Sequence, residues 1–199
     1  MSSPYEGIAT KDWSAVTQKL LDSHPLTERE LVDVALTSWN SIFASRFGTA
    51  GFTIGKQIFP KPQIMGFVLH ELIPLELAAR YPGSWKVDEE KNDKDCVCTL
   101  DDYFSFEIKT SSNANKIFGN RSYAQASSNG RKAKDGFYLT INFEKFDKTG
   151  VQPEIKLIRF GWLESTDWIG QKAATGQQSN LPPEVYEGKL KIINKSEQS

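Results

Sequence analysis

Residues 95–109, DCVCTLDDYFSFEIK, begin with the acid Asp95 and end with a second acid and a lysine, Glu107 and Lys109. From Tyr103 to Lys109 apolar and polar side chains alternate strictly, which is the two-residue period of a half-buried β-strand. Residues 95–99 form a second short run, and residues 100–102 between the two runs suit a three-residue hairpin loop. The stretch therefore predicts an antiparallel pair of strands with one apolar face and one polar face.

The register of this hairpin decides what its polar face can do. If the turn is centred on Asp101, Asp95 lies opposite Glu107, and residues directly opposite each other have Cβ atoms about 4.5 to 5.5 Å apart. Two carboxylates so placed repel unless a cation lies between them, and Mg²⁺ takes one or two carboxylates together with water and phosphate oxygens. Lys109 follows on the same face, where it could orient or deprotonate an attacking water. A slip of one residue would turn Asp95 to the other face and remove the site.

The composition is that of an ordinary globular domain. The chain has 199 residues, of which 39% are hydrophobic and 25% charged, and a net charge of -1, which argues against a disordered chain or a polycationic nucleic-acid binder. We expect a single domain over residues 1–199, with loose ends at about 1–11 and 195–199. The sequence has no secretory signal and no apolar run long enough to span a bilayer, so we expect a cytoplasmic protein with no membrane contact. Cys96 and Cys98 are expected to be buried free thiols.

Three helices are predicted in the first half of the chain. Apolar residues recur at helical spacing over 12–23 and again over 27–46, where the second helix begins with a capping box. The third helix is predicted over 63–81, with a kink at Pro74. Because it is apolar nearly all round, we expect this helix to be buried.

Two further strands are predicted over 136–143 and 155–163, both rich in β-branched and aromatic residues. In the first of them, alternation places Tyr138 and Thr140 on the outward face. Residues 168–174 are expected to form a short helix or turn.

Two acid-free polar segments are the best candidates for contact with DNA. The first begins after the hairpin and runs to Lys134, and the second covers 171–180. Cations in these segments could neutralise phosphates, and amide side chains could donate to phosphates or base edges. Ordinary solvated loops are the alternative interpretation of both segments. The candidate DNA-binding residues are Lys116, Asn120, Arg121, Tyr123, Gln125, Arg131, Lys132, Gln177 and Gln178.

Four short motifs resemble a known nuclease family. They are SFEIKTSS at 105–112, IFGNRSY at 117–123, RFGW at 159–162 and AATGQQ at 173–178. On these motifs the sequence resembles type II restriction endonucleases of the PD-(D/E)xK superfamily, and within them the ScaI-like group. The resemblance implies an α/β fold, a restriction-endonuclease-like core with a mixed central β-sheet flanked by α-helices. It also implies a homodimer that uses Mg²⁺ to cut double-stranded DNA at a short palindromic site, leaving 5′-phosphates.

The superfamily motif also implies roles for individual residues. Carried onto this sequence, it makes Asp95 and Glu107 metal ligands, with the main-chain carbonyl of Ile108 as a further ligand. Lys109 would then be the water-orienting base. These enzymes commonly lend one more acid from the helix ahead of the motif, and Glu71 is the residue we expect in that role.

Some assignments stay open from the sequence alone. Lys94 stands where the motif usually has proline, so Asp88 and Asp93 are alternatives to Asp95 as the ligand. The helix over 27–46 is a candidate dimer interface. A DNA repair or junction-resolving nuclease, or a DNA-binding module without catalysis, are alternative functions.

The charged residues of the third predicted helix also have a plain structural interpretation. Instead of serving the site, Glu71 or Glu76 could pair with Arg80, because buried acids are nearly always partnered. His70 is interpreted as structural, since two histidines in the whole chain give little support to a histidine-centred catalytic triad.

Overall fold

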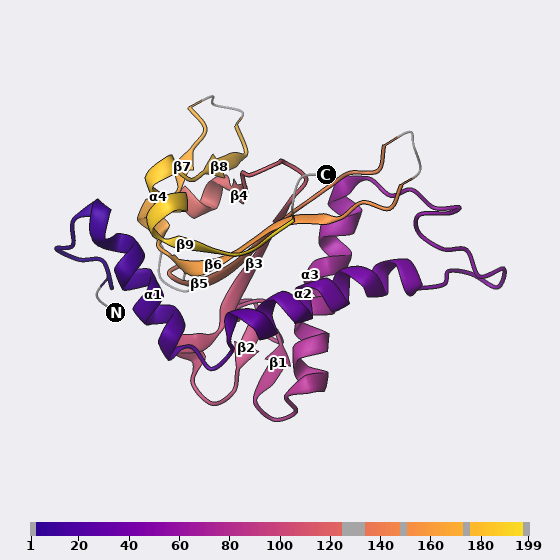
Figure 1. Ribbon diagram of the computed structural model, residues 1–199, viewed down its shortest axis with the longest axis horizontal. Helices are drawn as coiled ribbons and strands as arrows, with labels where there is room; N and C mark the ends of the chain where they lie inside the picture. The colour runs from indigo at the N-terminus through magenta and orange to yellow at the C-terminus, as the bar shows by residue number, and fades with distance from the viewer. Residues whose placement is uncertain (1–2, 125–133, 148–150, 173–175, 197–199) are drawn as a thin grey trace.

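The computed structural model describes residues 3–124, 134–147, 151–172 and 176–196. They form a mixed six-stranded sheet in the order β1-β2-β3-β5-β6-β9, with helices packed against it (Figure 1). Within this sheet β3 and β5 run parallel, and the other neighbouring strands are antiparallel. The predicted α/β class with a mixed central sheet is confirmed. The strands are β1 (Trp85–Val87), β2 (Cys96–Cys98), β3 (Phe106–Ser111), β5 (Gly136–Phe143), β6 (Ile155–Leu163) and β9 (Leu190–Lys195).

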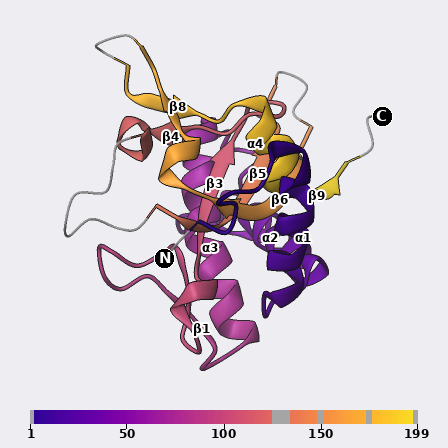
Figure 2. The same cartoon turned by 90° about the vertical axis from the view of Figure 1, so that its left-hand side faces the viewer.

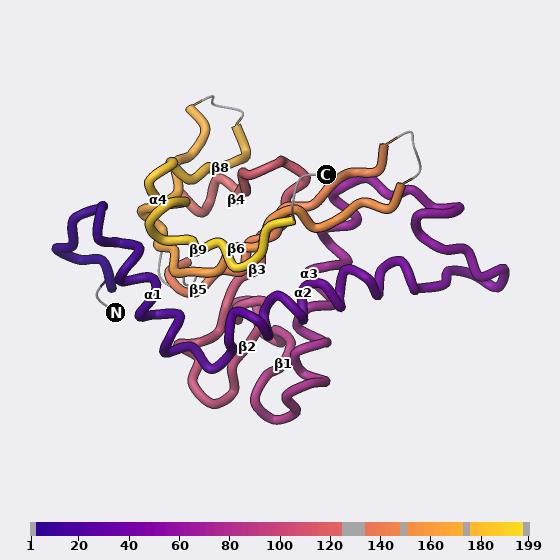
Figure 3. Tube along the Cα trace, in the orientation of Figure 1, coloured from indigo at the N-terminus to yellow at the C-terminus, as the bar shows by residue number. Residues whose placement is uncertain are grey.

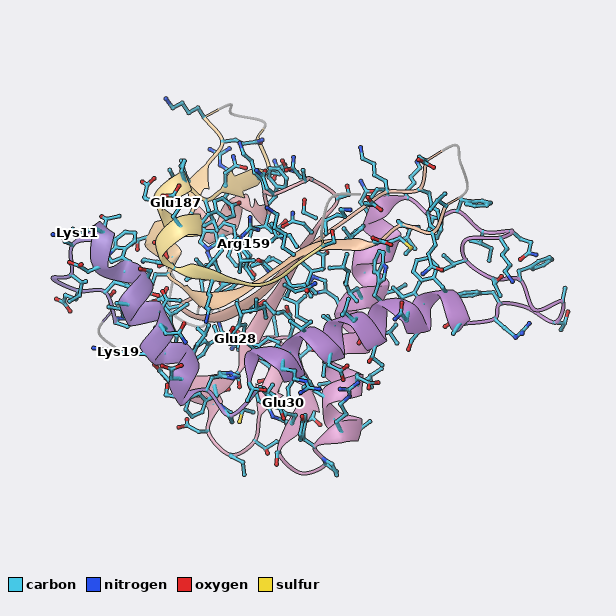
Figure 4. The ribbon with its side chains drawn as sticks, viewed as in Figure 1. Lys11, Lys19, Glu28, Glu30, Arg159 and Glu187 are labelled. Carbon is cyan, nitrogen blue, oxygen red and sulfur yellow. The ribbon has the colours of Figure 1, made fainter. Side chains whose placement is uncertain are left out.

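The three helices predicted in the first half of the chain are present, and a fourth follows near the end. The helices are α1 (Trp13–Ser23), α2 (Glu28–Ala44), α3 (Pro62–Arg80) and α4 (Pro183–Gly188). The predicted capping box begins α2, because the Thr27 side chain accepts from the Glu30 amide and the Glu30 carboxylate accepts from the Thr27 amide. Figure 4 shows Glu28 and Glu30 at this first turn. A capping box satisfies two amides that the helix itself leaves without acceptors.

The N-terminal segment packs more closely than the expected loose end. Tyr5 is buried, and its hydroxyl lies 2.9 Å from that of Thr17 on α1. The Thr17 hydroxyl in turn donates to the Gly188 carbonyl at the end of α4. These contacts hold α1 beside α4, where both views place them (Figures 1 and 2).

The main core lies between one face of the sheet and the helices α2 and α3. Its fully buried members include Phe106 and Ile108 on β3 and Leu139 on β5. Leu31 on α2 and Leu69 on α3 pack into the same cluster. Burial of such side chains stabilises the fold by about 1.5 to 3 kcal/mol each. Cys96 and Cys98 of β2 are also buried and form no disulfide, as expected.

The second face of the sheet is buried as well, which differs from the sequence expectation. Tyr138 and Thr140, expected to face outward, are both fully buried. A small three-stranded sheet and α4 lie over this face (Figure 1) and enclose a second core around Tyr138, Trp168 and Val185. The small sheet is built from β4 (Gly119–Asn120), β7 (Ile169–Gly170) and β8 (Gln178–Asn180). Its strands come from distant parts of the chain, so no local pattern indicates the cover.

Residues 168–174 were predicted as a helix or turn, and that prediction is wrong for the part that the structure describes. A short 3₁₀-helix, η4 (Ser165–Asp167), ends just before Trp168. Burial of the Trp168 ring in the second core directs the following residues into β7, which pairs with β8. Residues 173–175 lie outside the described part of the chain.

The prediction that α3 is buried all round is also wrong. Its inward face is buried, but Ile64, Phe67 and Leu75 are each more than half exposed, at 54%, 64% and 54%. The helix lies at the side of the sheet, so only one of its faces meets the core. Pro74, where a kink was predicted, lies inside the helix. The connection from α2 to α3, residues 45–61, projects from the body of the molecule (Figure 3). Among the helices that the structure describes, none has the length and apolar character needed to cross a membrane.

Candidate active site

The hairpin that carries the site has the predicted register. Cys96 of β2 pairs with Phe106 of β3, so the next positions outward along the same register are Asp95 and Glu107. This is the pairing expected for a turn centred on Asp101. It brings the two carboxylates to the same end of the two strands.

The connection of the hairpin is longer than the predicted three residues. Residues 99–105 join the strands and include a 3₁₀-helix, η2 (Asp102–Phe104). The Asp101 carboxylate accepts from the Tyr103 amide at 3.0 Å and so begins this turn. The Ser105 hydroxyl then accepts from the Cys98 amide at 2.9 Å and replaces a ladder hydrogen bond. The register survives because the extra residues are added about the same centre.

Asp95 is fixed at the site by the backbone of β3. Its Oδ2 accepts from the Ile108 amide at 2.7 Å, and the ring Nδ1 of His70 lies 3.6 Å from the same oxygen. Asp93 instead accepts from two backbone amides of the preceding turn at 3.0 Å, and Asp88 is exposed. Among the three aspartates considered from the sequence, Asp95 is therefore the one held against β3.

Glu107 lies at the centre of the site and is only 2% exposed. The ammonium of Lys109 lies 3.5 Å from its Oε2 and donates to the Ile108 carbonyl at 3.1 Å. Burial lowers the pKa of Lys109, but nearby groups, the negative charges of Glu107 and Asp95 among them, together raise it by more. The pKa of Lys109 is therefore above its ordinary value. The polar face of β3 is thus enclosed, whereas the alternation alone predicts only that it is polar.

Two tyrosines enclose the lysine. The ring centre of Tyr123 lies 4.8 Å from the Lys109 ammonium, and that of Tyr138 lies 5.9 Å from it. Burial raises the pKa of Tyr123, and the charge of Lys109 opposes this rise. Tyr123, a candidate for DNA contact from the sequence, therefore lies against the central lysine of the site.

α3 supplies the opposite wall. Glu71 is exposed and lines a pocket of about 740 Å³ together with His70, with Ser111 and Ser112 at the end of β3, and with Gln178. His70 links this pocket to the carboxylates, because its ring lies 3.6 Å from Asp95.

The other glutamate on α3 is committed elsewhere. Glu76 accepts from Arg80 at 2.7 Å, and Arg80 also pairs with Asp33 of α2. The structural interpretation therefore holds for Glu76, and Glu71 is the acid of this helix on the pocket side. His70, interpreted as structural, lies beside Asp95. Its place depends on how α3 packs on the hairpin, and no sequence pattern carries that information.

The polar residues of the second and fourth motifs meet in the small sheet. Asn120 of β4 pairs with Gln178 of β8, and the Arg121 amide donates to the Gln177 carbonyl at 2.7 Å. The Arg121 guanidinium donates to the Gly176 carbonyl at 3.2 Å. These residues, separated by more than fifty positions in the chain, form one edge of the same pocket through Gln178.

The remaining candidates for DNA contact are not all at this edge. Lys116 lines a separate pocket of about 260 Å³ with Arg159 and Tyr186. Figure 4 shows Arg159 within the main sheet and Glu187 on α4 nearby. The last three candidates lie outside the described residues: Gln125, Arg131 and Lys132.

Comparison with known proteins identifies the family. Residues 3–194 match the ScaI restriction endonuclease family, which is nearly the whole chain. The chain belongs to that family. The type II restriction enzyme ScaI of Streptomyces caespitosus is 52% identical over 194 residues, a match that covers 96% of this chain and 85% of that enzyme. No solved structure matches the chain.

Membership of the ScaI family gives the site a reaction. The chain is a type II restriction endonuclease, a site-specific deoxyribonuclease, and its substrate is double-stranded DNA. Enzymes of this type generally need a divalent metal. The family resemblance that the sequence motifs predicted is therefore confirmed.

The side chains of the site fit a divalent metal of the oxygen-binding kind. Asp95 and Glu107 offer carboxylates, and Ile108 offers its main-chain carbonyl. The Lys109 ammonium lies 3.5 Å from the Glu107 carboxylate and 3.1 Å from the Ile108 carbonyl. Within the described residues, no group of three or more His, Cys, Asp and Glu could hold a metal. A donor set with few carboxylates suits Mg²⁺, which keeps several waters and takes phosphate oxygens from its substrate.

Proposed function

We propose that this restriction endonuclease uses Mg²⁺ to cut both strands of DNA at a short palindromic site, leaving 5′-phosphates. The observation that carries the proposal is the meeting of Asp95, Glu107 and Lys109 at one end of the hairpin, where His70 lies beside Asp95 and also lines the open pocket. The resemblance of this stretch to the PD-(D/E)xK motif supports the same roles. The proposal treats the chain as a single nuclease domain.

In this proposal each residue of the hairpin has one task. Asp95, Glu107 and the Ile108 carbonyl hold the metal, which would supply Lewis acidity at the scissile phosphate. Lys109 donates a hydrogen bond that orients the attacking water, and its positive charge stabilises the charge that develops on the phosphate. The raised pKa of Lys109 supports this task over deprotonation of the water. Glu71 adds an accessory acid from α3.

DNA contact is proposed for the edge formed by the small sheet. Asn120, Arg121, Gln177 and Gln178 lie there beside the pocket, and Tyr123 lies between this edge and Lys109. Amide side chains can read base edges, and an arginine can bind phosphate or guanine. Contacts from Lys116, Gln125, Arg131 and Lys132 are part of the same proposal.

A symmetric homodimer is proposed because one domain with one site cuts one strand at a time, and a palindrome presents two equivalent strands. The candidate interface over 27–46 exposes one large apolar side chain, Leu36, in the described chain. Several more are exposed on the connection from α2 to α3 and on α3 itself, namely Phe47, Phe52, Phe59, Ile64 and Phe67. We therefore place the interface on this neighbouring surface. Light scattering of the protein on DNA should give the dimer mass, and a monomer mass would contradict the proposal.

Digestion of mixed-sequence plasmid DNA tests the catalytic assignment. With Mg²⁺ the parent should give discrete fragments, and end sequencing should return one palindrome with 5′-phosphates. The Glu107→Ala protein should give none. Fragments that persist undiminished in Glu107→Ala would contradict the assignment of the site.

A further inference from the structure

A second buried lysine lies against the catalytic carboxylate. Lys94 directly precedes Asp95, and its side chain is only 10% exposed. Its ammonium lies 4.0 Å from Oε1 of Glu107, while the Lys109 ammonium lies 3.5 Å from Oε2. The two lysines therefore approach the two oxygens of one carboxylate. Lysine is almost never fully buried unless it is paired, so this placement needs a cause.

The surroundings of Lys94 hold its ammonium in that place. It donates to the Asp135 carbonyl at 3.2 Å and lies 5.5 Å from the ring centre of Tyr138. The first residue of β5 is Gly136, and a Cβ added there would lie 3.3 Å from both the Cε and the Nζ of Lys94. A larger residue at the start of β5 would therefore press on the end of the lysine. The carbonyl, the ring and the glycine together define a position for one ammonium.

We propose that Lys94 is a positioning residue for DNA cleavage, whose charge attracts Oε1 of Glu107 and so keeps Oε2 toward Lys109. The inference rests on the roles proposed above for Glu107 and Lys109. A terminal carboxylate torsion is broad and has no sharp minimum, so a contact on one oxygen alone leaves the group free to rotate. A positive charge near each oxygen, at 4.0 and 3.5 Å, favours one plane of the carboxylate over the others.

The charge of Lys94 has a second consequence. Glu107 and Asp95 bring two negative charges to the site, and Lys94 and Lys109 bring two positive ones. An added cation near Glu107 weakens the attraction of the carboxylate for a metal. Lys94 therefore trades some metal affinity for a fixed ligand geometry. A variant without the Lys94 charge should bind metal more tightly and cut DNA more slowly. Loss of folding does not produce this combination.

Lys94→Met, Lys94→Gln and Lys94→Arg test this inference beside the parent. Met removes the charge at similar length, Gln removes it but keeps a donor for the Asp135 carbonyl, and Arg keeps the charge. Single-turnover cleavage is measured at saturating Mg²⁺, Mn²⁺ binding is measured by electron paramagnetic resonance, and folding is followed by thermal melting. Gln replaces Met as the test variant if Met lowers the melting temperature.

The expected result separates rate from affinity. Lys94→Met or Lys94→Gln should cut at least about tenfold more slowly, because small misplacements of catalytic groups are costly. The same variant should bind Mn²⁺ at least about threefold more tightly, because a nearby positive charge is gone. Lys94→Arg should recover most of the cleavage rate and the parental Mn²⁺ affinity.

Two results would overturn the inference. One is a parental cleavage rate in both uncharged variants. The other is slower cleavage with unchanged or weaker Mn²⁺ binding and no recovery in Lys94→Arg, which is the behaviour of a lysine that serves folding alone. Glu107→Gln, assayed in parallel, separates this failure from that of the proposed function. If Glu107→Gln still cuts DNA, the site itself is wrongly assigned, whereas if only the Lys94 variants cut at the parental rate, this inference alone fails.

Discussion

Two buried groups of lysine and carboxylate side chains differ in how closely their charges approach. In the Glu107 cluster (Glu107, Lys94 and Lys109), the ammonium to carboxylate distances are 4.0 and 3.5 Å. In the Lys189 cluster (Lys189, Glu164 and Asp167), the ammonium lies 2.7 Å from each carboxylate. Charge-assisted hydrogen bonds have their full strength near 2.7 to 2.9 Å. The Lys189 cluster is closed on itself, and the wider Glu107 cluster has room for a further ligand.

The surroundings of the Lys189 cluster are those of a structural element. Its ammonium lies over the rings of Tyr5 and Trp13, at 4.4 and 4.7 Å, and so connects α4 and β9 to the N-terminal segment. A Cβ added at Gly161 would lie 1.9 Å from the Lys189 carbonyl. The backbone of β6 at Gly161 therefore packs directly against the backbone at the start of β9, with no room for a side chain between them. Burial raises the pKa of Asp167, against the lowering effect of Lys189. Buried charge alone therefore does not distinguish an active site, and it is the wider spacing of the Glu107 cluster that supports the site proposed here.

The largest effect is expected for Asp95→Asn. This change removes one negative charge at nearly constant shape, so cleavage should fall by about 10³-fold or more, since metal assistance is worth several kcal/mol. DNA binding without metal, or with Ca²⁺, should be at least as tight as in the parent because repulsion of the phosphates is relieved. A gel-shift titration beside a Mg²⁺ cleavage time course checks both. Cleavage near the parental rate would move the ligand role to Asp93 or Asp88.

Lys109→Met comes next in size. Without the donor that orients the water, cleavage should fall by about 10² to 10⁴-fold, the range for a positioned proton-handling group. Unlike Asp95→Asn, this variant should not gain DNA affinity, because it loses a cation near the phosphate. Single-turnover cleavage and the same gel-shift titration measure the two effects. A variant that binds DNA more tightly would be inconsistent with a lysine facing the phosphate.

Lys189→Met moves the test to the structural cluster. Two buried carboxylates would lose their cation, and breaking a buried ion pair in this way typically costs about 3 to 5 kcal/mol of folding free energy. Cleavage per folded molecule should stay at the parental rate at a temperature where the variant is folded. Denaturant unfolding and a cleavage assay on the same sample provide both numbers. Lost cleavage in a fully folded sample would mean that the cluster serves the site.

The smallest effect is expected for Lys191→Met. Its ammonium lies 2.6 Å from Glu28, as close as a structural contact, but both side chains are more than a third exposed. Solvent screening limits such surface pairs to about 0 to 1 kcal/mol. The free energy of unfolding should shift by no more than that, with unchanged cleavage. A larger shift in the free energy of unfolding would show that an ion pair at short distance stabilises the fold even when it is not buried.

The sequence predicts the Glu107 cluster only in part. The strict alternation after Tyr103 predicts the strand, but the pairing of Asp95 with Glu107 follows from the sequence only if the turn is centred on Asp101, and the register of the structure shows that it is. The loop length does not follow, because the Ser105 hydroxyl replaces a backbone acceptor for the Cys98 amide in a way that composition cannot reveal. Local patterns predict which residues share a face of a strand. They do not predict where a side chain takes the place of a backbone group in the hydrogen bonds between strands, because that depends on the folded hairpin.

The parts of the site that come from elsewhere in the chain are not predictable from local patterns. His70 reaches Asp95 only through the packing of α3 on the hairpin, and Lys94 reaches its place only beside the start of β5. Tyr138 was expected to face outward because a period of two cannot tell solvent from a second core. The cover over it is formed by β4, which precedes it in the chain, and by β7, β8 and α4, which follow it.

A paired measurement on Glu107→Gln and Asp167→Asn tests the division between the two clusters most directly. Each change removes one buried negative charge at nearly constant shape, one from each cluster. We predict that Glu107→Gln loses Mg²⁺-dependent cleavage in a sample that is still folded, and that Asp167→Asn keeps cleavage but melts at a clearly lower temperature. The opposite pattern, cleavage retained in Glu107→Gln or lost in folded Asp167→Asn, would contradict the assignment of the active site.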